Sequence, residues 1–234
     1  MTIGAVTERQ LRTKSAPAEV EQVGKIWTPT LPSLALDVAR NLVPFHAVVA
    51  VSSILRELSQ YNRFERAKST QVCKSLKQEL ADDFRHQGNP WHQEQGLSVL
   101  QAADGAIESP GEGFLLWILH GLLESSTLRD EIACQWPITI QGRRYYADVA
   151  LPNLKALFEF DGYSKVDGKR HQFVERQRLL VEAGWHILRV ELREVSTPRT
   201  ATLRVKAFLE SLGVHTPNHW GRWWAETSRT SRQL

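Results

Sequence analysis

The 234-residue chain has only two cysteines, no long apolar run and no nucleotide-binding glycine loop. Cys73 and Cys134 lie far apart without the spacing of metal ligands, so we expect two buried thiols in a reducing cytoplasm and no disulfide. No apolar run is long enough to cross a bilayer, and residues 1–17 lack the apolar core of an export signal, which predicts a cytoplasmic protein without membrane contact. Without a GxxxxGK[ST] loop, ATP-driven motion within the chain is not expected, and the histidines lack zinc-site spacing.

Charge is present in ordinary amount but is unevenly distributed. The formal net charge is +3, yet residues 169–234 carry 12 Lys and Arg against 6 Asp and Glu, while the preceding residues carry 17 against 20. A basic segment beside an acidic cluster suits a nucleic-acid enzyme, because cations hold the polyanion and carboxylates hold a metal. Solvated arginine-rich helices explain the same distribution equally well, so charge alone does not decide the function.

Carboxylates gather where two predicted strands end. Asp148 ends one apolar strand, and the next strand delivers Glu159 and Asp161 at positions i and i+2. Because side chains alternate along a strand, Glu159 and Asp161 should project from the same face. Carboxylates are rarely buried in a sheet unless they are paired or bound to a cation. The pattern predicts oxygen ligands for Mg²⁺ (or Mn²⁺), and such sites usually act on phosphate.

The chain divides into four predicted segments. They are an N-terminal extension (1–31), an α-helical subdomain (32–105), an α/β domain (106–215) and a C-terminal tail (216–234). The helical subdomain has its clearest apolar face at Ala47, Val48, Val51, Leu55 and Leu58, which we expect to be buried against the sheet or against a partner protein.

The α/β domain has the predicted order α-β-β-β-α-β. Ser109 is a plausible N-cap and Pro110 suits the first helical position, with Glu112 in the first turn. The following elements are strands at 132–140, 143–151 and 154–160, a helix at 169–183 closed by Gly184, a strand at 185–191 and a helix at 201–212. This order predicts a mixed sheet flanked by helices.

The order and its residues resemble the PD-(D/E)XK nuclease superfamily, and more closely its very-short-patch-repair-like endonuclease domains. The resemblance covers roughly residues 108–195. It rests on Ser-Pro-Gly-Glu112, Asp148-Val-Ala-Leu-Pro, Phe-Glu159-Phe-Asp161-Gly, Arg176 and Gly184-Trp-His-Ile-Leu-Arg-Val190, in that order. It implies a restriction-endonuclease-like core preceded by the helical subdomain.

The resemblance also implies roles for individual residues. Asp148 would be the central metal ligand and Glu159 the second, with Glu112 contributing directly or through a water. Asp161 stands where the wider superfamily usually has lysine, which leaves open whether Lys165 or Arg176 supplies the balancing cation.

Basic residues of the helix at 169–183 are the expected nucleic-acid contacts. Lys169, Arg170 and Arg178 would hold the backbone beside the scissile group. The implied function is a metal-dependent endonuclease acting on DNA, with a possible protein partner at the helical half.

Each candidate also has a purely structural interpretation. Glu159 could form a buried salt bridge with Arg144 or Lys155, and Asp161 before Gly162 is a common turn pair. Asp148 could simply end a strand, Glu112 could be a first-turn anion, and Arg176 could be solvated. The alternative function is therefore a catalytically degenerate nuclease fold that binds DNA or regulates, as in a toxin–antitoxin or defence system. Gln177, where related proteins often carry an acid, favours this alternative.

Overall fold

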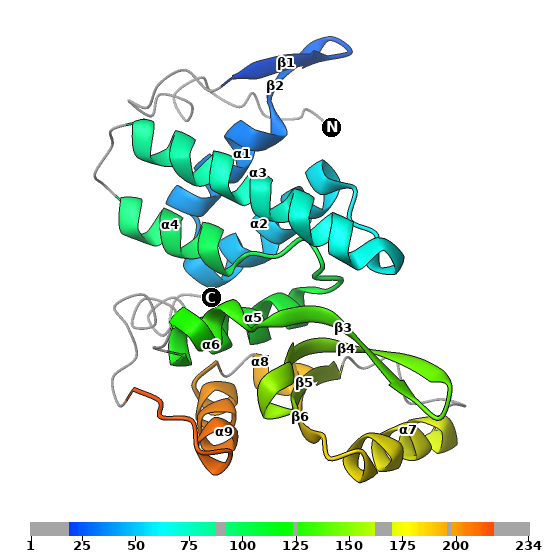
Figure 1. The fold of residues 1–234 in the computed structure, drawn as a ribbon. Coiled ribbons are helices and arrows are strands. Elements are labelled where there is room, and N and C mark those ends of the chain that lie inside the picture. The colour runs from blue at the N-terminus through cyan, green and yellow to red at the C-terminus, as the bar shows by residue number, and fades with distance from the viewer. Residues whose placement is uncertain (1–18, 88–91, 124–125, 162–169, 196–197, 218–234) are drawn as a thin grey trace, which may run out of the picture.

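The computed structural model describes residues 19–87, 92–123, 126–161, 170–195 and 198–217. Within these ranges a layer of helices is stacked on a mixed α/β part, and α5 runs between the two (Figure 1).

The first part of the chain is helical apart from a short hairpin. Its elements are β1 (Val20–Val23), β2 (Ile26–Pro29), α1 (Leu31–Asn41), α2 (Pro44–Ser59), the 3₁₀ turn η2 (Arg63–Glu65), α3 (Arg66–His86) and α4 (Gln93–Ala102). The hairpin was not predicted, and its large apolar side chains are exposed. Helix α1 begins at Leu31 because Thr30 caps it, and Pro32 is tolerated in its first turn, where no N–H donor is needed.

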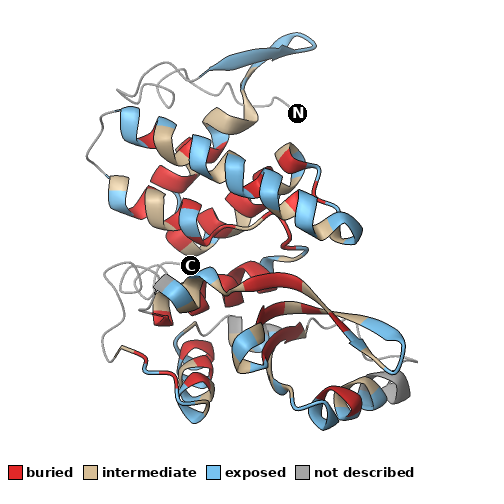
Figure 2. Cartoon of the chain, viewed as in Figure 1, coloured by how far each residue is buried: buried red, intermediate tan, exposed pale blue. Residues whose placement is uncertain are grey.

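The predicted apolar face of α2 is buried. Ala47, Val48, Val51 and Leu55 are fully inaccessible to solvent, and Leu58 is partly buried against the same core. Helix α2 packs on α5 (Pro110–Leu122), so one hydrophobic core continues from the helical layer into the α/β part (Figure 2). The expected contact with the α/β part is therefore made through α5 rather than through the sheet directly.

The second part contains a four-stranded sheet with helices on both faces. After α5 come α6 (Ser126–Asp130), β3 (Ala133–Ile140), β4 (Arg143–Leu151), the 3₁₀ turn η3 (Pro152–Leu154), β5 (Ala156–Asp161), α7 (Arg170–Glu182), β6 (His186–Glu191), α8 (Leu192–Val195) and α9 (Pro198–Ser211). The spatial order is β3-β4-β5-β6, with β6 parallel to β5 and the other pairs antiparallel. The mixed α/β architecture is thus confirmed, and the short helices α6 and α8 are additions that periodicity did not predict.

Alternation along β5 sends successive side chains to different helical layers. Phe158 faces α5 and α9, where its ring meets Phe208 edge-on at 5.4 Å between centroids. Leu157 belongs instead to a smaller core on the opposite face, together with Leu180 of α7. The sheet therefore separates α5 and α9 from α7.

Two predicted turns have the expected backbone. Gln141 and Gly142 join β3 to β4 with φ values of 50° and 75°, as a two-residue hairpin requires. Gly184 has a φ of 81° after α7, and Trp185 N–H donates to the Leu180 carbonyl oxygen at 3.0 Å. Both turns fix the direction in which a strand enters the sheet.

Both cysteines are free and buried, as expected. Burial raises the pKa of the Cys73 and Cys134 thiols, which argues against either as a ready nucleophile. Across the residues that the structure describes, no helix has the length and apolar character needed to span a membrane.

Candidate active site

The predicted carboxylates lie where the two central strands separate. Strands β4 and β5 pair only from Leu151–Ala156 to Val149–Phe158. Beyond that point β4 stays with β3, and β5 continues beside β6 as far as Asp161. We call this opening the fork; Asp148 and Glu159 are the first residues beyond the last pair.

Asp148 occupies an irregular position in the sheet. It stands opposite Gln135, and this is the one register position of the β3–β4 ladder that forms no pair. Gln135 has a φ of 48°, which is uncommon for a residue other than glycine and breaks the regular ladder. The half-buried Asp148 carboxylate accepts a hydrogen bond from Phe160 N–H at 2.8 Å and so holds the two strands together across the fork.

Glu112 approaches the fork from the first turn of α5. The Ser109 hydroxyl accepts from Glu112 N–H at 3.3 Å, as an N-cap does, and donates to Glu112 Oε1 at 2.9 Å. Glu112 Oε2 accepts from Glu108 N–H at 2.9 Å and from Gln135 Nε2 at 3.2 Å. These donors fix the orientation of a carboxylate that is only 6% exposed.

Gly111 allows this turn to lie directly on β5. A Cβ atom at this position would come within 2.2 Å of the Phe160 ring. No larger residue fits without moving that ring, so the glycine sets how closely α5, and with it Glu112, approaches the fork.

Glu112 lies near Asp148, because Gln135 stands opposite Asp148 in the β3–β4 register and donates to Glu112. Burial, and then the negative charge of Asp148, raise the pKa of Glu112 to about 7, although its hydrogen bonds act in the opposite direction. Two carboxylates that share a desolvated space disfavour simultaneous ionisation. A cation between them would relieve that repulsion.

Glu159 and Asp161 each pair with an arginine, on the face of the sheet that α7 covers. Arg176 Nη2 donates to Glu159 Oε1 at 2.8 Å, and the two side chains are only 23% and 5% exposed. Arg189 of β6 holds Asp161 through Nη1, at 3.2 and 3.0 Å from the two carboxylate oxygens. The buried salt bridge that was the structural alternative for Glu159 therefore exists, but its partner is Arg176. Lys155 donates instead to the Ala183 carbonyl oxygen at 3.3 Å.

The structure brings together some predicted site residues and leaves others elsewhere. Glu112, Asp148, Glu159, Asp161 and Arg176 surround the fork. Arg178 points away and pairs with Glu182 on the exposed side of α7 at 2.6 Å. Lys165 and Lys169 lie outside the described residues, and Arg170 begins α7 without a described side chain.

The four predicted ligands form two groups rather than one. Glu112 and Asp148 interact with each other, whereas each carboxylate of the second group, Glu159 and Asp161, has its own arginine. Within the described ranges, no set of three or more Asp, Glu, His or Cys side chains is gathered as a metal site.

Two residues that matter at the fork were not predicted. Arg189 lies directly opposite Glu159 in the parallel β5–β6 register and turns to Asp161, so a charge-pairing search between neighbouring strands would have found it. Gln135 had no such signal, because nothing in its sequence context predicts a left-handed residue inside a strand.

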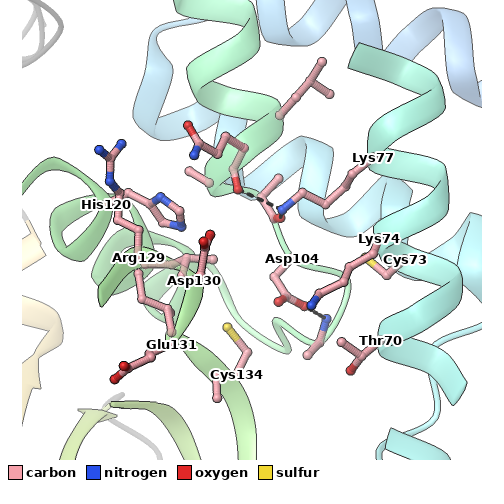
Figure 3. A pocket seen from close by; sticks show the side chains of 18 of the residues that line it. Thr70, Cys73, Lys74, Lys77, Asp104, His120, Arg129, Asp130, Glu131 and Cys134 are labelled. Carbon is pink, nitrogen blue, oxygen red and sulfur yellow. Dashed lines mark hydrogen bonds between the residues drawn. The ribbon is translucent and has the colours of Figure 1, made fainter. Parts of the chain in front are cut away.

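A separate cleft opens between the helical layer and the α/β part, lined by residues of α3, α4, α5, α6 and β3 (Figure 3). Its volume is ≈ 1130 Å³, and charged side chains line it, namely Arg66, Lys74, Lys77, Arg85, Asp104, Arg129, Asp130 and Glu131. Lys77 donates to the carbonyl oxygens of Gln101 and Ala103 at 2.8 and 2.7 Å, so its ammonium group caps the C-terminal end of α4. None of the fork carboxylates lines the cleft, which we therefore treat as distinct from the candidate site.

Comparison of the chain with protein-family models, with curated proteins and with solved structures gives no match.

Proposed function

We propose that the chain is a metal-dependent endonuclease of the PD-(D/E)XK type, close to the very-short-patch-repair-like branch, which hydrolyses phosphodiester bonds in DNA in the cytoplasm. The observation that supports this most directly is the pair formed by Glu112 and Asp148 at the fork, where burial and then the negative charge of Asp148 raise the pKa of Glu112 to about 7. A buried site that disfavours its own negative charge suits a divalent cation and its phosphate ligand.

The residues at the fork fit Mg²⁺ or Mn²⁺. In the proposal Asp148 and Glu112 hold the ion, and Glu159, at the next register position of β5, is a further oxygen donor. Such an ion polarises the phosphate and lowers the pKa of the attacking water. The Glu108 and Gln135 donors keep the Glu112 carboxylate oriented before any ligand arrives.

Among the residues that the structure describes, Arg176 is the cation best placed to balance charge that develops on the phosphate. It lies 2.8 Å from Glu159 and is only 23% exposed, so little solvent screens it. In this proposal Arg176 takes the part that a motif lysine would have at position 161. Arg189 pairs with Asp161 and holds that carboxylate in place. Lys169 and Arg170 remain proposed backbone contacts from the sequence, whereas Arg178 pairs with Glu182 on the exposed side of α7 and is not carried into the proposal.

The test is direct. The purified chain is incubated with plasmid, single-stranded DNA and RNA in Mg²⁺, Mn²⁺ or EDTA, beside Asp148→Ala. The proposal expects metal-dependent cleavage that Asp148→Ala abolishes. Failure to cut any substrate, or equal cutting by the variant, would refute it.

One observation favours a second candidate, a DNA-binding or regulatory protein that keeps a nuclease fold without catalysis. Arg176 and Arg189 already neutralise two of the four predicted ligands. Thermal unfolding with and without Mn²⁺ separates the candidates: an ion that binds the native state raises the melting temperature by mass action, whereas a degenerate site does not respond.

A further inference from the structure

An exposed phenylalanine lies beside the fork. Phe64, in η2, is 72% exposed, which is the highest value among the large hydrophobic side chains that the structure describes. An apolar ring of this size gains free energy when it is covered, so its exposure calls for an explanation. Its backbone is held firmly, because the Asn62 side-chain oxygen accepts from Phe64 N–H at 3.0 Å and caps the 3₁₀ turn.

The ring is supported by an aromatic and a cationic neighbour. Tyr146 of β4 meets Phe64 edge-on, with 6.3 Å between ring centroids and an angle of 89°. The Arg63 guanidinium carbon lies 5.4 Å from the Phe64 centroid and 5.3 Å from that of Tyr146. Glu108 fixes this arginine at 3.4 Å. An exposed aromatic surface is thereby held next to a positive charge.

Two short chains of contacts connect this cluster to the candidate site. The Tyr146 carbonyl oxygen accepts from Arg176 Nη2 at 2.9 Å, and the same nitrogen donates to Glu159. Glu108, which holds Arg63, donates its backbone N–H to Glu112 at 2.9 Å. A ligand seated on Phe64 would therefore place its adjoining groups near the fork.

The chemistry of this cluster matches an unpaired nucleobase. A base presents a flat π face for stacking on Phe64, and its phosphate presents a negative charge to Arg63. Bases inside a duplex already stack on one another and cannot offer that face. A protein partner fits less well, because one ring among charged neighbours is far smaller than a stable protein interface requires.

We propose that Phe64, Arg63 and Tyr146 form a stacking platform for an unpaired base, so that the substrate class is a polynucleotide with a single-stranded segment at the cleavage site. The inference rests on the proposed function, since it places a nucleic acid at the fork. It assigns to the helical half of the chain a direct part in substrate recognition.

The experiment measures equilibrium binding by fluorescence anisotropy in EDTA, so that no cleavage occurs. The probes are a labelled single-stranded deoxyoligonucleotide and a duplex of the same sequence. Phe64→Leu keeps an apolar side chain but loses the π face, and Phe64→Trp keeps both. Trp27→Leu is the matched control, because Trp27 is 66% exposed in a hairpin of the same helical half. Since both positions are exposed, the substitutions leave the core intact.

The platform predicts that Phe64→Leu weakens single-strand binding at least fivefold, while Phe64→Trp and Trp27→Leu bind as the parent does. Duplex binding should be the same in all four proteins. Equal single-strand binding by Phe64→Leu, or an equal loss on the duplex, would overturn the inference. A fivefold loss in a protein that cuts nothing in Mn²⁺ would support the platform and refute hydrolysis. Metal-dependent cleavage with unchanged single-strand binding by Phe64→Leu would support hydrolysis and refute the platform.

Discussion

Replacing Glu112 by glutamine should stabilise the metal-free protein at alkaline pH. The folded state holds the pKa of Glu112 near 7, against 4.5 for an ordinary glutamate, so folding binds a proton between these values. The contribution of Glu112 to the free energy of unfolding is therefore fully present below pH 4.5 and is lost as the pH rises through 7. At 1.36 kcal/mol per pKa unit the loss amounts to about 3 kcal/mol. Glutamine resembles the protonated acid and can keep all three hydrogen-bond partners.

The assay is urea unfolding in EDTA at pH 4.5 and pH 8. Glu112→Gln should match the parent at pH 4.5 and exceed it by about 3 kcal/mol at pH 8. Glu79→Gln, at an exposed position of α3, is the control and should change neither value. Added Mn²⁺ should stabilise the parent more than Glu112→Gln. A variant that is no more stable at pH 8 than the parent would show that Glu112 does not carry a buried charge beside Asp148.

Three further outcomes follow from the packing and the charges. Burial, with Lys77 and Arg129 nearby, lowers the pKa of His120 to about 3. As the pH falls from 6.5 towards 3, His120→Gln should therefore become more stable than the parent by about 1.4 kcal/mol per pH unit. Urea unfolding at a series of pH values measures this difference. Gly111→Ala should cost about 1–3 kcal/mol and weaken any Mn²⁺ response, because its methyl group collides with the Phe160 ring; thermal unfolding with and without Mn²⁺ measures both effects. Val51→Asp should unfold the chain or cost more than about 3 kcal/mol in urea, since it buries an unpaired charge, whereas Ser53→Asp on the exposed side of α2 should be tolerated.

Much of the α/β architecture follows from local sequence signals. Ser109 and Pro110 mark the start of α5, Gly142 marks the hairpin turn, and Gly184 ends α7, because each position needs a cap or a backbone conformation that few residues supply. The hairpin β1–β2 could not be predicted in this way, since its strands have four residues each and bury almost nothing.

The composition of the fork was predictable, but its pairing was not. Alternation correctly places Glu159 and Phe160 on opposite faces of β5. Which cation reaches each carboxylate depends on tertiary contacts: Arg176 comes from α7 and Arg189 from a parallel strand, each far along the chain. The repulsion between Glu112 and Asp148 likewise depends on how closely Gly111 lets α5 approach β5.

The most direct test of the central claim is single-turnover cleavage of an end-labelled single-stranded DNA, measured in Mn²⁺ for the parent, Asp148→Asn and Asp130→Asn. Asp130 is an exposed acid that lines the separate cleft between the helical layer and the α/β part, and it serves as the matched control. The account predicts cleavage by the parent and by Asp130→Asn, and a loss of at least a hundredfold in rate for Asp148→Asn, about 2.7 kcal/mol in activation free energy. Absence of cleavage by the parent, or equal rates for the parent and Asp148→Asn, would contradict a metal-dependent hydrolytic site at the fork.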